Sequence, residues 1–271
     1  MDKNKIRLWK WVLLLLLALF LAFVGMALLE MLASPSGHPV LMLLGAAALV
    51  FLYYGGVRVV ELRTPSDLPL KRLLPDTGLG LLIGAGFMAC VVGVIAATGC
   101  ASIASAAFQW MEQLTVFLFF LCIAVAEEVM FRGVLFRWID ERFGLCPALI
   151  VSSLIFGFMH ILQPNATVWS SLAIAIEAGL MLGAVYKWAG TLWLPIGIHW
   201  AWNFVQGNVF GIAVSGSDAG PSFFRTTVQG PDIVTGGAFG AEASIVAVVL
   251  GAALSAWFIY RIGQRTKHAV S

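Results

Sequence analysis

Charged residues are scarce in this chain of 271 residues: only 11% are Asp, Glu, Lys or Arg, whereas 61% are hydrophobic. Soluble domains carry roughly 25% charged and roughly 45–50% apolar residues. The shortage of charge therefore excludes a soluble enzyme, a disordered chain and a nucleic-acid-binding protein. It predicts an integral membrane protein whose apolar helices lie in a lipid bilayer.

Cysteine is scarce as well. The chain has no Cys-x2-Cys pair, which argues against a disulfide framework and against a thiolate zinc site; its four cysteines are Cys90, Cys100, Cys122 and Cys146. A cleavable signal peptide is not indicated either. The apolar run after the basic N-terminus continues to Ala33, which is longer than the roughly 7–15 residues of a signal-peptide core. We interpret this run as a retained first helix.

Apolar runs separated by Pro, Gly and charged clusters predict an all-α polytopic protein with about eight transmembrane helices in a single membrane domain, 1–271. The expected spans are 9–33, 39–60, 78–98, 112–138, 146–162, 168–188, 192–210 and 241–260. If the N-terminus is cytoplasmic, every Lys and Arg except Arg225 falls on the cytoplasmic side, and both termini are cytoplasmic. The Gly- and Ser-rich stretch 211–240 is then an extracytoplasmic loop, and its composition indicates no chemistry.

Ionisable residues inside membrane helices are costly and mark candidate functional sites. The predicted helix 112–138 carries Glu127, Glu128 and Arg132. At about 100° per residue, Glu128 and Arg132 share one helix face, while Glu127 points roughly 140° away from Arg132. Arg132 is therefore expected to hold Glu128, which leaves Glu127 available as a general base.

Two histidines stand in otherwise apolar stretches. His160 lies near the end of the helix 146–162, and Asn203 follows His199 one turn later on the same face of the helix 192–210. A carboxylate base, an imidazole, and a second imidazole with an amide are the groups that activate water and stabilise an oxyanion. Counted at about 1.5 Å per residue, His160 lies deeper than the other groups, so it joins them only if its helix is tilted.

Each pattern also has a purely structural interpretation. The Glu–Arg pair is then a salt bridge, His160 a helix-end histidine facing water, and His-x3-Asn an interhelical hydrogen-bond clamp. Their joint occurrence in a chain with so few polar residues favours a functional site. Of the remaining carboxylates, Glu177 is expected in a packing or hydrogen-bonding role. We expect the others to be solvated near helix ends, at Glu30, Glu112 and Glu242.

The motifs Glu-Glu-x3-Arg-Gly (127–133), Phe-x3-His (156–160) and His-x3-Asn (199–203) resemble, in type and order, those of the CPBP family. This family includes type II CAAX prenyl endopeptidases and bacteriocin-processing "Abi" proteases. The resemblance covers roughly residues 112–208, a catalytic core of four helices. It implies an intramembrane endopeptidase that acts on a membrane-associated protein or peptide. The Gly-, Ala- and Leu-rich style of the chain favours a bacterial plasma membrane.

The resemblance also implies roles for the polar side chains of the motifs: Glu127 would activate water with His160 as its partner, His199 and Asn203 would form an oxyanion hole, and Glu128 and Arg132 would orient the first motif. No cofactor is expected. Zinc stays open as an alternative, because Glu127, His160 and His199 are of a type that binds it. The absence of a His-Glu-x2-His motif favours the mechanism without metal.

Two other functions stay open from the residues alone. An ion- or proton-coupled transporter would use Glu127, His160 and His199 as a relay, although the chain has no internal repeat of the kind many transporters show. A non-catalytic immunity or scaffold protein would keep the same fold for binding only. Substitution of Glu127 discriminates among the three functions. It would abolish proteolysis in an endopeptidase, abolish uptake in a transporter and change nothing in a scaffold protein.

Overall fold

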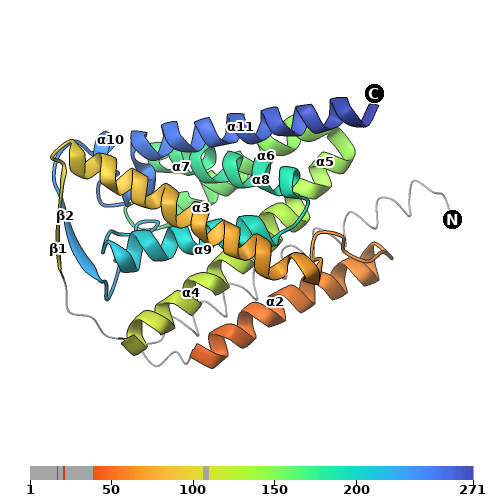
Figure 1. Ribbon diagram of the computed structural model, residues 1–271, viewed down its shortest axis with the longest axis horizontal. Coiled ribbons are helices and arrows are strands. Elements are labelled where there is room, and N and C mark those ends of the chain that lie inside the picture. Colours follow the sequence, from red (N-terminus) through yellow and green to blue (C-terminus); the bar gives the residue numbers. More distant parts are fainter. Residues whose placement is uncertain (1–16, 18–20, 22–38, 106–109, 271) are drawn as a thin grey trace.

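The computed structural model describes residues 17, 21, 39–105 and 110–270. Its helices are α2 (Pro39–Val60), α3 (Leu70–Ala97), α4 (Trp110–Glu128), α5 (Arg137–Phe143), α6 (Leu145–Met159), α7 (Val168–Ile174), α8 (Met181–Ala189), α9 (Trp193–Phe204), α10 (Asp232–Thr235) and α11 (Ile245–Val270). Several π-helical segments continue them: η1 (Val129–Phe136), η3 (Ala175–Leu180) and η4 (Val205–Val209). Short 3-10 turns are η2 (His160–Leu162) and η5 (Ala241–Ala243). Figure 1 shows how these elements are arranged.

The prediction of an all-α polytopic membrane protein is confirmed. Within the described ranges, six helical segments are long and apolar enough to cross a bilayer: 42–59, 70–97, 110–143, 145–162, 168–189 and 245–265. Each overlaps a predicted span, and the predicted helix 9–33 lies outside the described residues except at positions 17 and 21. The predicted span 192–210 forms α9 and η4 instead of a seventh such segment. Most α9 side chains are buried against neighbouring helices, so this short helix belongs to the interior of the bundle.

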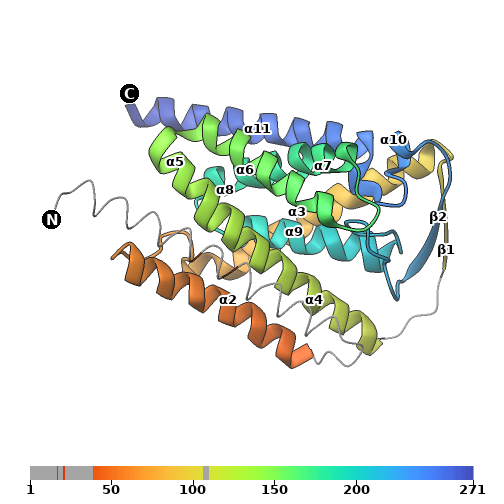
Figure 2. The same cartoon turned by 180° about the vertical axis from the view of Figure 1, so that it is seen from behind.

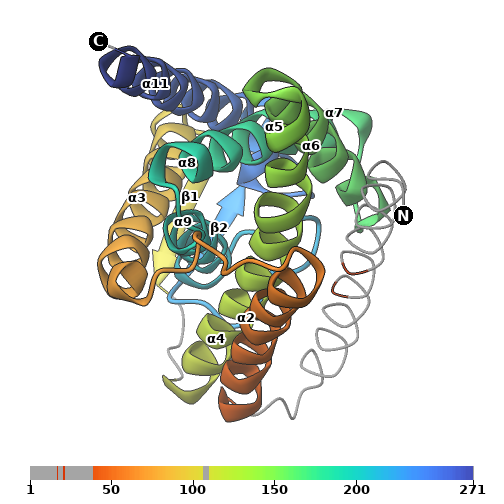
Figure 3. The same ribbon diagram turned by 90° about the vertical axis from the view of Figure 1, so that its right-hand side faces the viewer.

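α9 lies near the middle of the bundle. The end-on view in Figure 3 places it between α3 and α4, with α2 outside α4 and α11 across the far side of α8. Seen from behind, α4, η1 and α5 form one long helical rod that runs alongside α2 (Figure 2). This arrangement brings the end of α4 and the middle of α9 together in the core.

The backbones of α3 and α9 approach each other closely because glycine occurs where they meet. A Cβ atom at Gly84 would overlap the carbonyl group of Ile198, and a Cβ atom at Gly80 would overlap the carbonyl oxygen of Leu194. Small residues at such crossings allow close packing of membrane helices. The position of α9, and of the polar residues on it, therefore depends on these glycines.

We expect Gly84→Ala to lower the free energy of unfolding by about 1–3 kcal/mol, because the added methyl group forces the α3 and α9 backbones apart. Thermal unfolding of the purified protein in detergent measures this change. Gly86→Ala is the matched control, since Gly86 lies on the same helix with open space around its Cβ position. The control is expected to be neutral or stabilising by up to about 1 kcal/mol. Equal unfolding temperatures for the two variants would contradict the close approach.

A short antiparallel ladder was not predicted from the sequence. β1 (Ala101–Ser105) pairs with β2 (Phe224–Val228), at the end of the molecule opposite the C-terminus (Figure 1). The pairing ties the segment after α3 to the stretch 211–240, which is therefore fastened to the bundle. Strands this short are hard to recognise between long apolar runs, because alternation over five residues gives little signal.

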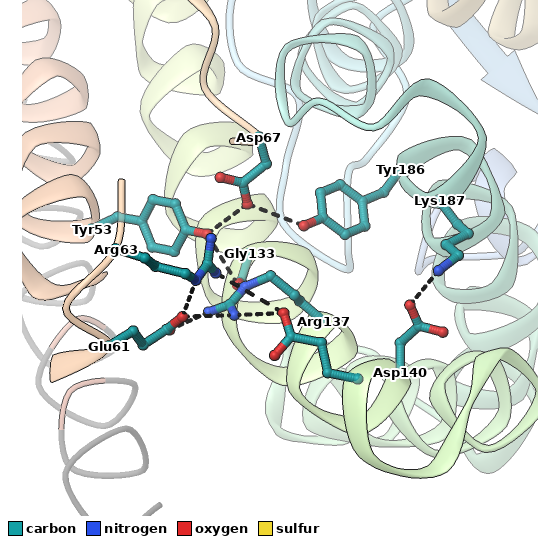
Figure 4. Close-up of polar contacts among 10 residues, drawn as sticks. Tyr53, Glu61, Arg63, Asp67, Gly133, Arg137, Asp140, Tyr186 and Lys187 are labelled. Carbon is teal, nitrogen blue, oxygen red and sulfur yellow. Dashed lines mark hydrogen bonds and ion pairs between the residues drawn. The ribbon is translucent and has the colours of Figure 1, made fainter. Parts of the chain in front are cut away.

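A network of polar side chains fixes the other end of the bundle (Figure 4). The Tyr53 hydroxyl lies 2.6 Å from Asp67 Oδ2 and 3.1 Å from the carbonyl oxygen of Gly133. Arg137 Nε donates to the same carbonyl oxygen at 2.7 Å, and its guanidinium also binds Glu61. These contacts hold η1 against α2 and the segment that leads into α3.

The described basic residues gather mainly at this same end. Arg72 donates to the carbonyl of Ala189, Lys187 pairs with Asp140, and Arg265 donates to the carbonyl of Trp188. This clustering agrees with the predicted positive-inside pattern, and the side of the membrane stays a prediction. One assignment is wrong: Arg132 was counted among the cytoplasmic basic residues but is only 2% exposed in the core, where a carboxylate pairs with it.

Candidate active site

Glu128 is the buried centre of the candidate site. It is the last residue of α4 and has no exposed surface. Its Oε1 atom accepts a hydrogen bond from Arg132 Nη1 at 2.8 Å and lies 2.9 Å from His199 Nδ1. The predicted pairing of Glu128 with Arg132 is therefore present. The carboxylate also fixes the imidazole, because an Nδ1–H that faces Glu128 leaves Nε2 directed away from it.

The Arg132 guanidinium contacts Glu128, the backbone of η3 and the Phe156 ring. Besides its bond to Glu128, Nη2 lies within hydrogen-bonding distance of the carbonyl oxygens of Ala178 and Gly179 in η3, at 3.1 and 3.2 Å. The guanidinium carbon lies 4.5 Å from the centre of the Phe156 ring, in a cation–π contact. A buried charge is tolerated when it is paired and hydrogen-bonded in this way.

Glu127 points away from this pair, as its place on the helix predicted. Its Oε2 atom lies 3.9 Å from His199 Nε2 and has no hydrogen-bond partner within the described residues. A water oxygen can lie within about 2.7–3.0 Å of both atoms across such a gap. Glu127 Oε2 and His199 Nε2 are therefore separated by a distance that a single water oxygen can bridge.

His160 joins the site despite the expected difference in depth. It begins η2 directly after α6, and its Nδ1 lies 2.8 Å from the carbonyl oxygen of Phe156. Its ring packs against the Phe156 ring with the centroids 4.9 Å apart. Phe156, the first residue of the Phe-x3-His motif, thus contacts both Arg132 and His160.

The predicted residues His160, His199 and Asn203 line one small pocket of about 20 Å³, which has room for about one water molecule. Phe156 and Trp202 supply aromatic parts of its wall. The pocket also receives Ser215 from the stretch 211–240, although no chemistry was expected there. The motifs that are separate in sequence thus converge in space.

Sequence analysis missed two carboxylates that line this pocket. Glu177 in η3 has no exposed surface, and within the described part of the chain neither of its carboxylate oxygens has a hydrogen-bond partner. Of the two roles expected for it, packing agrees with this burial and hydrogen bonding does not. Glu242 in η5 is 2% exposed rather than solvated. Glu112, by contrast, is exposed as expected. No local pattern marks the buried pair, because η3 and the loop before α11 bring the two residues together.

Glu242 is held in the pocket by hydrogen bonds, which involve Ser215 and Gln206. Its Oε1 atom accepts the backbone N–H of Ser215 at 2.5 Å, and Ser215 has a positive φ of 48°. Burial raises the pKa of the Glu242 carboxyl to about 7, although the hydrogen bond from Ser215 acts in the opposite direction. Glu242 therefore fastens the loop at Ser215 over the pocket and changes charge near neutral pH.

The zinc alternative does not fit these residues as they are placed. Two ligand atoms of a tetrahedral zinc ion, each at about 2.0–2.2 Å, lie roughly 3.3–3.6 Å apart. Glu127 Oε2 and His199 Nε2 are 3.9 Å apart. Within the described ranges, no three His, Cys, Asp or Glu side chains are grouped so that they could hold a metal ion.

The fold and the site together define a polytopic membrane protein whose helices bury a carboxylate–imidazole centre. Residues 109–205 match the family model described as Type II CAAX prenyl endopeptidase Rce1-like. The family predicted from the three motifs is thereby confirmed. The matched segment contains Glu127, Glu128, Arg132, His160, His199 and Asn203.

A protein of Bacillus subtilis (strain 168), YpbD, is 35% identical to this chain over 79 residues. The matched region is 29% of this chain and 36% of YpbD, so the chain spans little more than a third of this relative's length. No solved structure gives a significant match to the chain.

Proposed function

We propose that the protein is an intramembrane endopeptidase that hydrolyses a peptide bond of a membrane-associated protein or peptide with a glutamate-activated water. The observation that carries this proposal is the gap of 3.9 Å between Glu127 Oε2 and His199 Nε2. It lies inside the segment that matches the Rce1-like family model, whose description names an endopeptidase. Only a membrane-associated substrate can readily reach a site buried among bilayer-spanning helices.

The proposed reaction starts with a water molecule between Glu127 and His199. Glu127 takes a proton from the water, and the hydroxide adds to the carbonyl carbon of the scissile peptide bond. The negative charge that develops on the carbonyl oxygen accepts hydrogen bonds from the Asn203 amide and from Nε2–H of protonated His199. Glu127 then gives its proton to the amine nitrogen as the carbon–nitrogen bond breaks.

The other motif residues support these steps. The Glu128 side chain contacts His199 through Nδ1 and can stabilise a positive charge on that ring, and Arg132 holds Glu128 in place. His160 has Nδ1 engaged at the Phe156 carbonyl, so Nε2 is left to contact the substrate or the attacking water. These residues orient groups and take no part in bond breaking.

The function is tested by comparing protein termini in membranes of cells that produce the wild-type protein or Glu127→Ala. Mass spectrometry of terminal peptides is expected to find new termini, within or next to membrane segments, only with the wild type. An identical set of termini in the two samples, despite equal amounts of folded protein, would contradict the proposal. That result would favour a binding protein or a transporter instead.

Metal removal gives a separate prediction. Cleavage of a substrate identified in that way, by purified protein in detergent, is expected to proceed at the same rate with and without a strong chelator. The physical reason is that Glu127 and His199 are spaced for a bridging water and are too far apart for tetrahedral zinc. Loss of cleavage with the chelator and its recovery on addition of zinc would contradict the mechanism without metal.

A further inference from the structure

Two carboxylates of the pocket have no part in the proposed reaction. Glu177 and Glu242 come from different segments, η3 and η5, and line the same pocket as His160 and His199. Glu177 is completely buried, and among the described residues nothing donates a hydrogen bond to either of its oxygens. Glu242 uses Oε1 to hold the Ser215 backbone. The pocket therefore presents the two Glu177 oxygens without matching donors from the described residues.

The described chain offers no free cation to balance this pair. No Lys or Arg side chain is among the described residues that line the pocket. The nearby guanidinium of Arg132 is engaged with Glu128 and with the carbonyls of Ala178 and Gly179. A buried carboxylate without a partner is strongly unfavourable. The group that would satisfy the pair is a positively charged hydrogen-bond donor from outside the chain.

The size of the pocket narrows the choice of donor. About 20 Å³ holds a group the size of a single water molecule. An ammonium group is about that size and has three donors, whereas a guanidinium group is planar and larger. His160 and His199 line the same space, so the bound group would lie next to two residues of the proposed active site.

We propose that Glu177 and Glu242 form an acidic subsite that binds an ammonium group of the substrate next to the bond that is cut. This proposal rests on the proposed endopeptidase function, which it extends to substrate choice. The ammonium group can come from a Lys side chain or from the N-terminal amine of a peptide. Glu177 and Glu242 are specificity residues in this view, separate from water activation.

Binding is expected to depend on pH through Glu242. Because its carboxyl titrates near pH 7, it is mainly neutral at pH 6 and mainly ionised at pH 8. Ammonium binding is therefore stronger at pH 8. The other titratable groups at the pocket are Glu177, His160 and His199, with Arg132 behind Glu177.

Binding can be measured without proteolysis. Thermal unfolding of the full chain in detergent is followed at pH 8 and pH 6 with methylammonium chloride, and with sodium chloride at the same ionic strength. We expect methylammonium to raise the unfolding temperature at pH 8, less so at pH 6, and not in Glu177→Gln or Glu242→Gln. Glu112→Gln, which alters an exposed carboxylate, keeps the rise. The subsite is overturned if the unfolding temperature does not rise with methylammonium, or if sodium chloride raises it equally. It is also overturned if methylammonium raises the unfolding temperature of Glu177→Gln as much as that of the wild type.

A second experiment identifies the source of the ammonium group, using a peptide substrate that the purified protein cleaves. The peptide is compared with versions in which Lys near the cut is replaced by norleucine or Arg, or in which the N-terminus is acetylated. We expect either the norleucine peptide or the acetylated peptide to have a kcat/KM about 10- to 100-fold lower than that of the original peptide. In Glu177→Gln, the ratio of the two kcat/KM values is expected to fall toward one. Sensitivity to norleucine indicates Lys, and sensitivity to acetylation indicates the N-terminus. Ratios near one for both peptides overturn the proposal while leaving the endopeptidase function intact.

Discussion

Glu127→Gln is expected to lower kcat for peptide cleavage by about 10²- to 10⁴-fold, the usual contribution of a general base. Glutamine keeps the size and hydrogen-bonding ability of the side chain but cannot take a proton from water. Substrate binding is expected to change little, because the Glu127 carboxylate acts on the water. Initial rates over a range of peptide concentrations in detergent separate kcat from KM.

Glu112→Gln is the matched control for this variant, because Glu112 is an exposed carboxylate in the first turn of the same helix. It is expected to retain wild-type kcat. Thermal unfolding shows whether both variants are folded. A Glu127→Gln protein that is folded and cleaves at more than about a tenth of the wild-type rate would exclude Glu127 as the general base.

Arg132→Met is expected to lower the free energy of unfolding by about 3–5 kcal/mol, because it leaves the Glu128 carboxylate buried without its cation. The effect is large because both partners are almost completely inaccessible to solvent, with side-chain exposures of 2% for Arg132 and 0% for Glu128. It also removes the bonds from Arg132 to η3. Denaturant unfolding in detergent, compared with the wild type, measures this loss.

Two controls show whether the effect comes from the unpaired carboxylate. Glu128→Gln combined with Arg132→Met removes both charges and is expected to recover part of the lost stability. Arg58→Met changes an exposed arginine whose side chain bonds Thr64 and is expected to alter stability by less than about 0.5 kcal/mol. If Arg132→Met were no more destabilising than Arg58→Met, the buried ion pair would not hold η1 in place.

The polar motifs were predictable from sequence because helical phase is a local property. The 100° rotation per residue separates Glu127 from Glu128 and places Arg132 beside Glu128, whatever surrounds the helix. The same holds for His199 and Asn203. Long apolar runs likewise indicated the bilayer-spanning segments, since hydropathy alone decides which helices can lie in lipid.

Features that depend on distant segments could not be predicted in this way. Glu177 and Glu242 share a pocket only because α11 and its preceding loop pack against η3, where Gly251 contacts the backbone of Glu177. The start of α3 was also misplaced. It begins at Leu70 rather than near residue 78, and it includes Pro75. The Arg72–Asp76 pair and the bond from Thr191 to Asp76 stabilise this first part of the helix.

The π-helical segment η1 has a consequence for how such a chain can change over generations. Its backbone takes about one residue more per turn than an α-helix. Because the wide turn already absorbs the extra residue, deletion of a single residue there would restore ordinary α-helical turns and leave the chain beyond it facing nearly the same way relative to Glu127 and Glu128. Arg137 would then still reach Glu61. Functional descendants should therefore tolerate a one-residue gap within 129–136 more readily than in the α-helical parts of the rod.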